Sequence, residues 1–140
     1  MPEESTTHDL IELVRTQLEA LTRRDLDPAL RFYAPDCVME LELGPPLEGV
    51  SAIRAFLEEL SGFYEEIEWE SEEVLDLGNG VGFAVIRMHG RPIGSSGYVQ
   101  MRLASVAAWT EGLVVWERHY TETDIDKARA AAERLAEERA

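Results

Sequence analysis

A glutamate and a histidine near the end of the chain, Glu117 and His119, are the pair best suited to acid/base chemistry. They lie two residues apart in 113–121, a segment whose alternation predicts a strand. Two positions on one strand face are separated by about 7 Å, so the two side chains can reach each other. A carboxylate beside an imidazole orients the ring, as proton transfer requires. A pair that only satisfies its own hydrogen bonds would leave the same pattern.

Other residue types that could do chemistry are few. Arg87 and His89 share a strand face if alternation holds through 81–89. The chain has three histidines and one cysteine, without the spacing of metal ligands, so we expect no metal and no cofactor. The single cysteine, Cys37, cannot form an intrachain disulfide, and we expect it to be a small apolar wall residue.

The first half of the chain predicts helices around one strand. Apolar residues recur at helical spacing over 7–23 and again over 50–60. Between them, Pro28 begins a short helix that carries Leu30, Phe32 and Tyr33, and Pro35 ends it. A strand follows over 37–43, in which Cys37, Met39, Leu41 and Leu43 share an inward face. Gly44-Pro45-Pro46 then forms a loop.

The second half predicts a sheet. Gly78-Asn79-Gly80 and Thr110-Glu111-Gly112 are hairpin signals, because these residues tolerate the positive φ angles of tight turns. The link over 90–97 has the composition of a mobile flap at a rim. The tail over 123–140 predicts a terminal, mostly solvated helix. The four expected strands are 67–77, 81–89, 98–110 and 113–121.

The length, composition and charge of the chain limit the class of protein to which it can belong. A chain of 140 residues with 45% apolar content forms one domain over 1–140, of which 123–140 is a helical tail. The net charge of −15 would repel nucleic acid and anionic lipid surfaces. No apolar run reaches the roughly 18 residues that a membrane span needs. Residues 1–5 lack the features of a signal peptide, so we expect a cytoplasmic protein.

The late strands are apolar on both faces. A sheet of this kind needs two covers, and the helices of the first half supply only one. We expect a second copy of the chain to supply the other, in a homodimer through the face that includes Val106, Ala108 and Trp116.

The order helix, strand, helix from Leu30 to Leu57, with the break at Tyr33-Ala34-Pro35-Asp36, resembles the nuclear transport factor 2-like superfamily. The likeness is greatest to its SnoaL-like and ketosteroid-isomerase-like members. This resemblance implies an α+β fold in which a cone-shaped, curved, mixed or antiparallel sheet wraps around N-terminal helices. Such a cystatin-like α+β barrel encloses one small-molecule cavity, and the C-terminal helix would be an addition to it.

The resemblance also implies which residues face that cavity. The catalytic base of ketosteroid isomerases would fall at Leu41, their tyrosine near Gln17 and their second acid near Ser105, so a classical ketosteroid isomerase is not expected. Glu117, His119 and Thr121 would lie on the cavity side. Arg87 could stand at the arginine of limonene-1,2-epoxide hydrolases, and Glu117 is the nearest substitute for the aspartate of SnoaL-like polyketide cyclases.

Two functions remain open. The chain is either an acid/base enzyme of isomerase, cyclase or hydrolase type that acts on a small apolar molecule, or a non-catalytic ligand-binding or dimerisation module. In the first case Glu117, His119 and Arg87 are the catalytic candidates. In both cases the expected ligand-binding residues are Tyr33, Cys37, Met39, Leu41, Phe56, Leu60, Trp69, Phe83, Val85, His89, Met101, Leu103, Ser105, Trp109 and Thr121.

Overall fold

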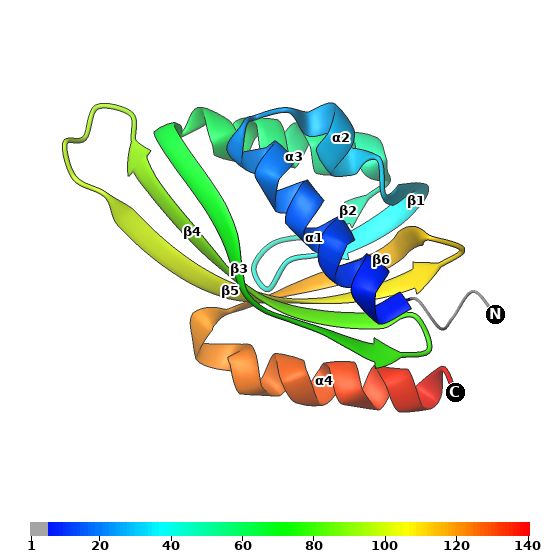
Figure 1. Cartoon of the computed structure of the whole chain (residues 1–140). Helices are drawn as coiled ribbons and strands as arrows, with labels where there is room; N and C mark the ends of the chain where they lie inside the picture. The colour runs from blue at the N-terminus through cyan, green and yellow to red at the C-terminus, as the bar shows by residue number, and fades with distance from the viewer. Residues whose placement is uncertain (1–5) are drawn as a thin grey trace.

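A computed structural model of the chain describes residues 6–140, so the first five residues of the expected domain lie outside it. Six strands form one curved, unclosed sheet in the order β2-β1-β6-β5-β4-β3. Helices α1, α2 and α3 lie on one face of this sheet and α4 lies on the other (Figure 1). The expected α+β architecture is confirmed.

Three helices cover the inner, concave face. They are α1 (Thr6–Thr22), α2 (Leu26–Leu30) and α3 (Val50–Gly62). Leu10 and Leu18 of α1 and Ile53 of α3 are buried, as their helical spacing predicts. The end of α1 is fixed to the edge strand, since the backbone N–H of Trp69 donates to Thr22 Oγ1 at 2.9 Å. The expected short helix ends earlier than the sequence suggested, because Tyr33 already belongs to a strand.

The first strand, β1 (Tyr33–Glu40), begins and ends earlier than expected. It runs parallel to β6, and this pairing ends where Glu40 lies opposite Arg118. On its other side it meets only the two-residue β2 (Leu47–Glu48). Beyond Glu40 the chain turns away from the sheet, so Leu41 is partly covered and Leu43 is 81% exposed. The inward position expected for Leu43 was therefore wrong.

Four long strands complete the sheet: β3 (Tyr64–Gly78), β4 (Val81–Pro92), β5 (Val99–Thr110) and β6 (Leu113–Thr121). Both hairpins are confirmed, with positive φ at Asn79 and Glu111. Gly80 is required for a second reason, because a Cβ there would lie 2.4 Å from the carbonyl oxygen of Trp109. Such a contact would separate β4 from β5.

The link between β4 and β5 is shorter than expected, since β4 continues to Pro92. The Arg91 guanidinium donates to the Ser95 carbonyl at 3.2 Å and to Glu65 at 3.0 Å. Next to it the rings of His89 and Tyr98 stack, with centroids 5.0 Å apart. These contacts join the expected flap to the outer side of the sheet.

The pairing of β4 with β5 decides which side chains face which helices. Ala84 lies opposite Ser105, and Phe83 lies opposite Val106. Because side chains alternate along a strand, the even residues of β4 and the odd residues of β5 share the inner face. The odd residues of β4 and the even residues of β5 then share the outer face, where Phe83, Val85 and Val106 pack against α4.

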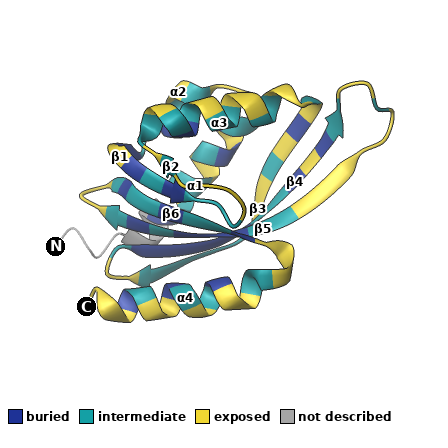
Figure 2. Ribbon diagram, turned by 180° about the vertical axis from the view of Figure 1, so that it is seen from behind, coloured by how far each residue is buried: buried dark blue, intermediate teal, exposed yellow. Residues whose placement is uncertain are grey.

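Helix α4 (Ile125–Glu138) covers this outer face and is not a mostly solvated tail. Its Ala128, Ala132 and Ala136 are buried at a spacing of four, and Figure 2 shows the buried residues recurring along the helix. Small side chains let the helix lie close to the sheet. Arg129 fixes it further through two hydrogen bonds to Glu73, of 2.9 and 3.1 Å.

This helix changes the basis of the expected homodimer. Val106 and Ala108 are buried, and Trp116 packs against the cluster that contains the α4 alanines. The chain itself therefore supplies the second cover from which the homodimer was inferred. The homodimer stays a prediction without that support.

Candidate functional site

Glu117 is the centre of the polar cluster on the inner face. Its side chain is buried, and its carboxylate has three hydrogen-bond partners. The Tyr33 hydroxyl donates to Oε1 at 2.8 Å. The Ser105 hydroxyl donates to Oε2 at 2.9 Å, and His119 Nε2 lies 2.6 Å from the same oxygen. The expected coupling of Glu117 with His119 is therefore present in the structure.

Three neighbouring strands bring these groups together. In the pairing of β5 with β6, Ala107 lies opposite Glu117 and Ser105 lies opposite His119. Alternation places all four residues on the inner face. Tyr33 comes from the start of β1, on the other side of β6, where its ring is buried in the core. The site thus sits on the central strands of the sheet.

The electrostatics keep the carboxylate ionised. Burial alone would raise the pKa of Glu117, but the charge of His119 and the hydrogen bonds from His119, Tyr33 and Ser105 outweigh it and lower the pKa. The pKa of Tyr33 is raised well above its ordinary value, first by burial and then by the charge of Glu117. Burial and the same charge raise the pKa of the Cys37 thiol to about 12. Tyr33 and Cys37 therefore stay protonated around Glu117.

A narrow cavity of about 50 Å³ lies between α1 and the sheet, and Glu117 forms part of its wall. Gln17 and Ser105 are the other polar side chains that line it, while most of the lining is apolar. The lining residues are Leu10, Val14, Gln17, Leu18, Val74, Gly82, Phe83, Ala84, Ile86, Ser105, Ala107, Trp109, Val114 and Glu117.

The inner face continues from this cavity toward solvent. On β5, Leu103, Met101 and Val99 follow Ser105 at every second position, and Thr121 of β6 lies opposite Leu103. Exposure rises along this line, from 7% at Ser105 to 40% at Met101 and 42% at Val99. In Figure 2 the start of β5 is coloured as exposed. We call the line Val99–Met101–Leu103–Ser105 the apolar lane, and it leads from solvent to His119 and Glu117.

Comparison with known proteins identifies the family. Residues 14–131 match the SnoaL-like domain family. The chain belongs to this family. A search of curated proteins found no match.

Solved structures confirm the fold of this SnoaL-like domain. An NTF2-like protein of unknown function from Burkholderia pseudomallei superposes with a TM-score of 0.70 at 20% identity, covering 85% of this chain and 94% of that one. A Jannaschia sp. CCS1 protein described as a SnoaL-like polyketide cyclase gives 0.70 at 16%, covering 91% and 93%. An LEH-like epoxide hydrolase from M. tuberculosis gives 0.69 at 18%, also covering 91% and 93%. At these identities the likeness shows the fold alone.

A second, wider pocket of the SnoaL-like domain, of about 380 Å³, lies between the end of α1, α2, α3 and β3. Leu60 and Trp69, which were both expected to bind ligand, line it together with Leu57 and Ile67. The expected wall residues therefore do not share a single cavity.

Other expected wall residues are part of the core. Cys37 and Met39 are buried in the cluster that contains Ile53, with Leu41 packed against it. Phe56 is half-buried and Thr121 is exposed. Of the expected wall residues in β5 and β6, Ser105 and Trp109 line the 50 Å³ cavity, while Met101 and Leu103 lie on the apolar lane.

Four expected site residues of β4 lie on the outer face, which corrects the expected orientation of this strand. Phe83 borders the small cavity, but its ring packs beneath the Arg129 guanidinium, 4.8 Å from the ring centroid. Val85 packs in the α4 cluster, and His89 is exposed against Tyr98.

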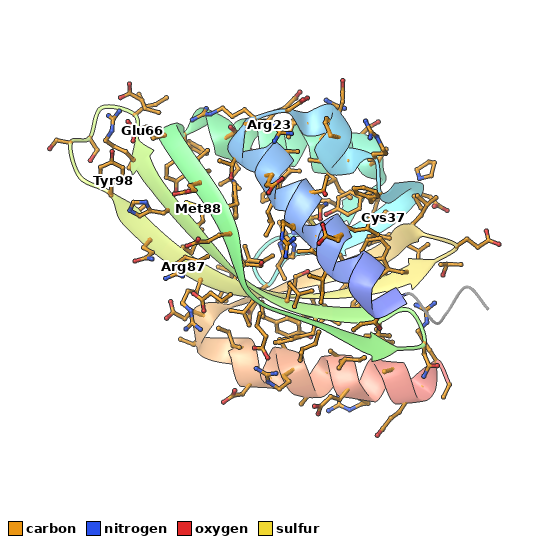
Figure 3. All side chains as sticks on the ribbon, in the orientation of Figure 1. Arg23, Cys37, Glu66, Arg87, Met88 and Tyr98 are labelled. Carbon is orange, nitrogen blue, oxygen red and sulfur yellow. The ribbon has the colours of Figure 1, made fainter. Side chains whose placement is uncertain are left out.

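Arg87 is the fourth of these residues. Its Nε lies 3.2 Å from Glu70 and 3.4 Å from Glu72. Figure 3 shows Arg87 on the outer side of the sheet, opposite to its neighbour Met88. The structure thus brings Glu117 and His119 together but does not bring Arg87 to them. The alternation of β4 alone could not reveal this, because both of its faces are apolar.

The sequence predicted Tyr33 and Ser105 only as wall, and their role as donors to Glu117 was missed. The position of Ser105 opposite His119 could have suggested it, since a hydroxyl next to a buried carboxylate becomes its donor. For Tyr33 the long-range pairing of β1 with β6 had to be known. Among residues 6–140 no group of three or more metal-ligating side chains converges. No helix of the described part is long and apolar enough to cross a membrane, and a cytoplasmic location stays a prediction.

Proposed function

We propose that this SnoaL-like domain binds a small, largely apolar molecule along the apolar lane and transfers a proton to or from it through His119. Glu117 acts as the positioning residue that holds the imidazole. The ligand would approach from the exposed end at Met101 and reach His119 before the buried carboxylate. This class of chemistry includes isomerisation, cyclisation and hydrolysis.

The arrangement around Glu117 carries the proposal. Since its carboxylate stays ionised, it is an acceptor for His119 Nε2–H, and this bond fixes both the tautomer and the orientation of the ring. Among the described residues, none has a hydrogen bond to His119 Nδ1. The proton would be exchanged at Nδ1, while Tyr33 and Ser105 keep the carboxylate in place.

The neighbouring structures support the same class of chemistry. One of them is named as an epoxide hydrolase and one is described as a polyketide cyclase. Transfer of either activity to this chain is part of our proposal.

A specific observation favours a second candidate function, a binding module without turnover. Three donors already satisfy the Glu117 carboxylate, and its cavity measures only about 50 Å³. A saturated polar cluster of this kind also serves simply to fix a core. In this case a ligand would raise the melting temperature but no product would form.

The test is a thermal-shift screen with small hydrophobic metabolites, followed by product analysis for each compound that binds. We expect a bell-shaped pH dependence of turnover, lost in His119→Ala and weakened in Glu117→Gln. Gln100→Ala is the matched control, because Gln100 is exposed and lies on the outer face opposite His89. Turnover that is unchanged in His119→Ala would refute the acid/base site. Binding without product would select the binding module.

A further inference from the structure

The indole of Trp109 carries a buried donor without a partner. Its Nε1 is shielded from solvent, and no hydrogen-bond acceptor lies within reach among the described residues. A buried N–H that lacks an acceptor is destabilising, so native proteins seldom leave one. Three other described side-chain atoms share this state, at Asp76, Arg87 and Arg118, but only Trp109 lines the cavity that contains Glu117.

The backbone that carries the indole is fixed on both sides. The Trp109 N–H donates to the Gly80 carbonyl at 2.6 Å, and the Trp109 carbonyl accepts from Arg139 at 3.1 Å. The first bond ties the residue to the turn before β4 and the second ties it to the end of α4. The backbone from which the indole extends is therefore held at a defined place beside the cavity.

The space beside the donor is kept open by a glycine. A Cβ placed on Gly82 would lie 3.6 Å from Trp109 Nε1 and 3.0 Å from Leu10 Cδ2. Gly82 also lines the cavity, and its φ lies outside the left-handed region, so the backbone itself does not require glycine. A side chain at this position would fill the space that an acceptor atom needs to reach the indole.

We propose that Trp109 Nε1–H binds a neutral carbonyl oxygen of the ligand, and that Trp109 and Gly82 together form its anchor site. This inference rests on the proposed function and names the ligand class: an apolar molecule with a carbonyl group at the end that enters the cavity first. Trp109 is a positioning residue, because it lies four residues from Ser105 along β5. The two backbone positions are about 13 Å apart at 3.3 Å per residue, and an indole N–H acts only as a hydrogen-bond donor and does not exchange its proton in acid/base catalysis.

The chemistry of the cavity selects a carbonyl over other acceptors. A carboxylate is disfavoured, because it would be buried near the ionised Glu117. A hydroxyl could accept from the indole, but its own proton would then need a second acceptor in a cavity whose lining is mostly apolar. A carbonyl accepts one hydrogen bond and brings no donor that must be satisfied.

The test uses acetone and 2-propanol, which share a carbon skeleton. They differ because acetone has a carbonyl oxygen where 2-propanol has a hydroxyl group with its own donor proton. The indole N–H resonances of the three tryptophans are followed by NMR in ¹⁵N-labelled protein, and Trp109→Phe assigns the signal. We expect acetone to shift the Trp109 signal saturably and to bind about fivefold or more tightly than 2-propanol. The signals of Trp69 and Trp116 should not respond.

A blocking variant completes the design. Gly82→Ala should abolish the saturable acetone shift, while unchanged Trp69 and Trp116 signals report that the fold is intact. Equal responses to both probes, or a shift of all three indoles together, would overturn the anchor, and the wild-type comparison decides even if the variant does not fold. His119→Ala should leave the acetone shift unchanged. A failure of the acid/base proposal, seen in turnover, would thus be distinguishable from a failure of the anchor proposal, seen in the acetone shift.

Discussion

Replacing Glu117 by glutamine tests the polar cluster most directly, because it keeps the shape of the side chain and removes the charge. Hydrogen bonds to a charged group contribute about 1.5–3 kcal/mol each, whereas neutral ones contribute about 1 kcal/mol. Three bonds converge on this carboxylate, and glutamine also turns one acceptor into a donor facing Tyr33 or Ser105. The smaller desolvation cost of a neutral amide offsets part of the loss. We expect the variant to be less stable by about 1–3 kcal/mol at pH 7.

The lowered pKa of Glu117 also predicts how the stability of the two proteins changes with pH. The pKa of Glu117 is lower in the folded state than its ordinary value of 4.5, so its charge stabilises the fold above that value. As the pH falls below 4.5, the unfolded state binds a proton that the folded state does not, and the stabilisation is lost through the folded pKa. The difference in free energy of unfolding between wild type and Glu117→Gln should therefore become smaller as the pH falls, because the other carboxylates are the same in both proteins.

Urea denaturation at a series of pH values between 7 and 3 measures this difference in the free energy of unfolding. Glu68→Gln is the matched control, since Glu68 is exposed and has no hydrogen bond or ion pair among the described residues. It should change stability by less than about 0.5 kcal/mol at every pH. A Glu117→Gln protein as stable as wild type at pH 7, or a gap that does not change with pH, would refute the view of an ionised, triply bonded carboxylate.

Three further outcomes follow from the fold. Ala132→Lys, which places a charge between α4 and the sheet, should cost about 3 kcal/mol or more in thermal or chemical denaturation, whereas the exposed Ala130→Lys should be near neutral. Gly80→Ala should prevent folding as judged by circular dichroism, because its Cβ would overlap the opposite strand, while Gly112→Ala meets no atom and should cost only about 1 kcal/mol. Tyr33→Phe should lower the free energy of unfolding by about 1.5–3 kcal/mol at pH 7. The stability difference between wild type and Tyr33→Phe should become smaller above pH 10. Because the pKa of Tyr33 is raised in the folded state, wild-type stability falls as the phenol of the unfolded state ionises. A difference that stays constant above pH 10 would contradict this prediction.

Much of the fold could be predicted because its signals are local. The helical spacing of Leu10 and Leu18 and the turn residues around Asn79 depend on a few neighbours in the sequence, and the structure has these elements where they were expected. The site was predicted only in part. Glu117 and His119 are close because they lie two residues apart on one strand.

The rest of the site depends on contacts between distant residues. The donors to Glu117 come from the two strands that flank β6, and Tyr33 lies 84 residues away from Glu117 in the sequence, so no local pattern marks it. The orientation of β4 was also beyond the sequence, because Phe83 and Val85 can fill either side of a sheet that is covered on both faces. The alanines of α4 gave a weak signal, since a buried alanine and a solvent-exposed one look the same in a sequence rich in alanine and glutamate.

The cover formed by α4 has a consequence for how stability depends on concentration. A partner subunit covers a sheet only above its dissociation constant, so the protection disappears on dilution. A helix joined to β6 through the three residues of η2 (Glu122–Asp124) has a high effective concentration that dilution does not change. The Phe83 side of the sheet therefore stays covered in a single molecule, whatever the protein concentration.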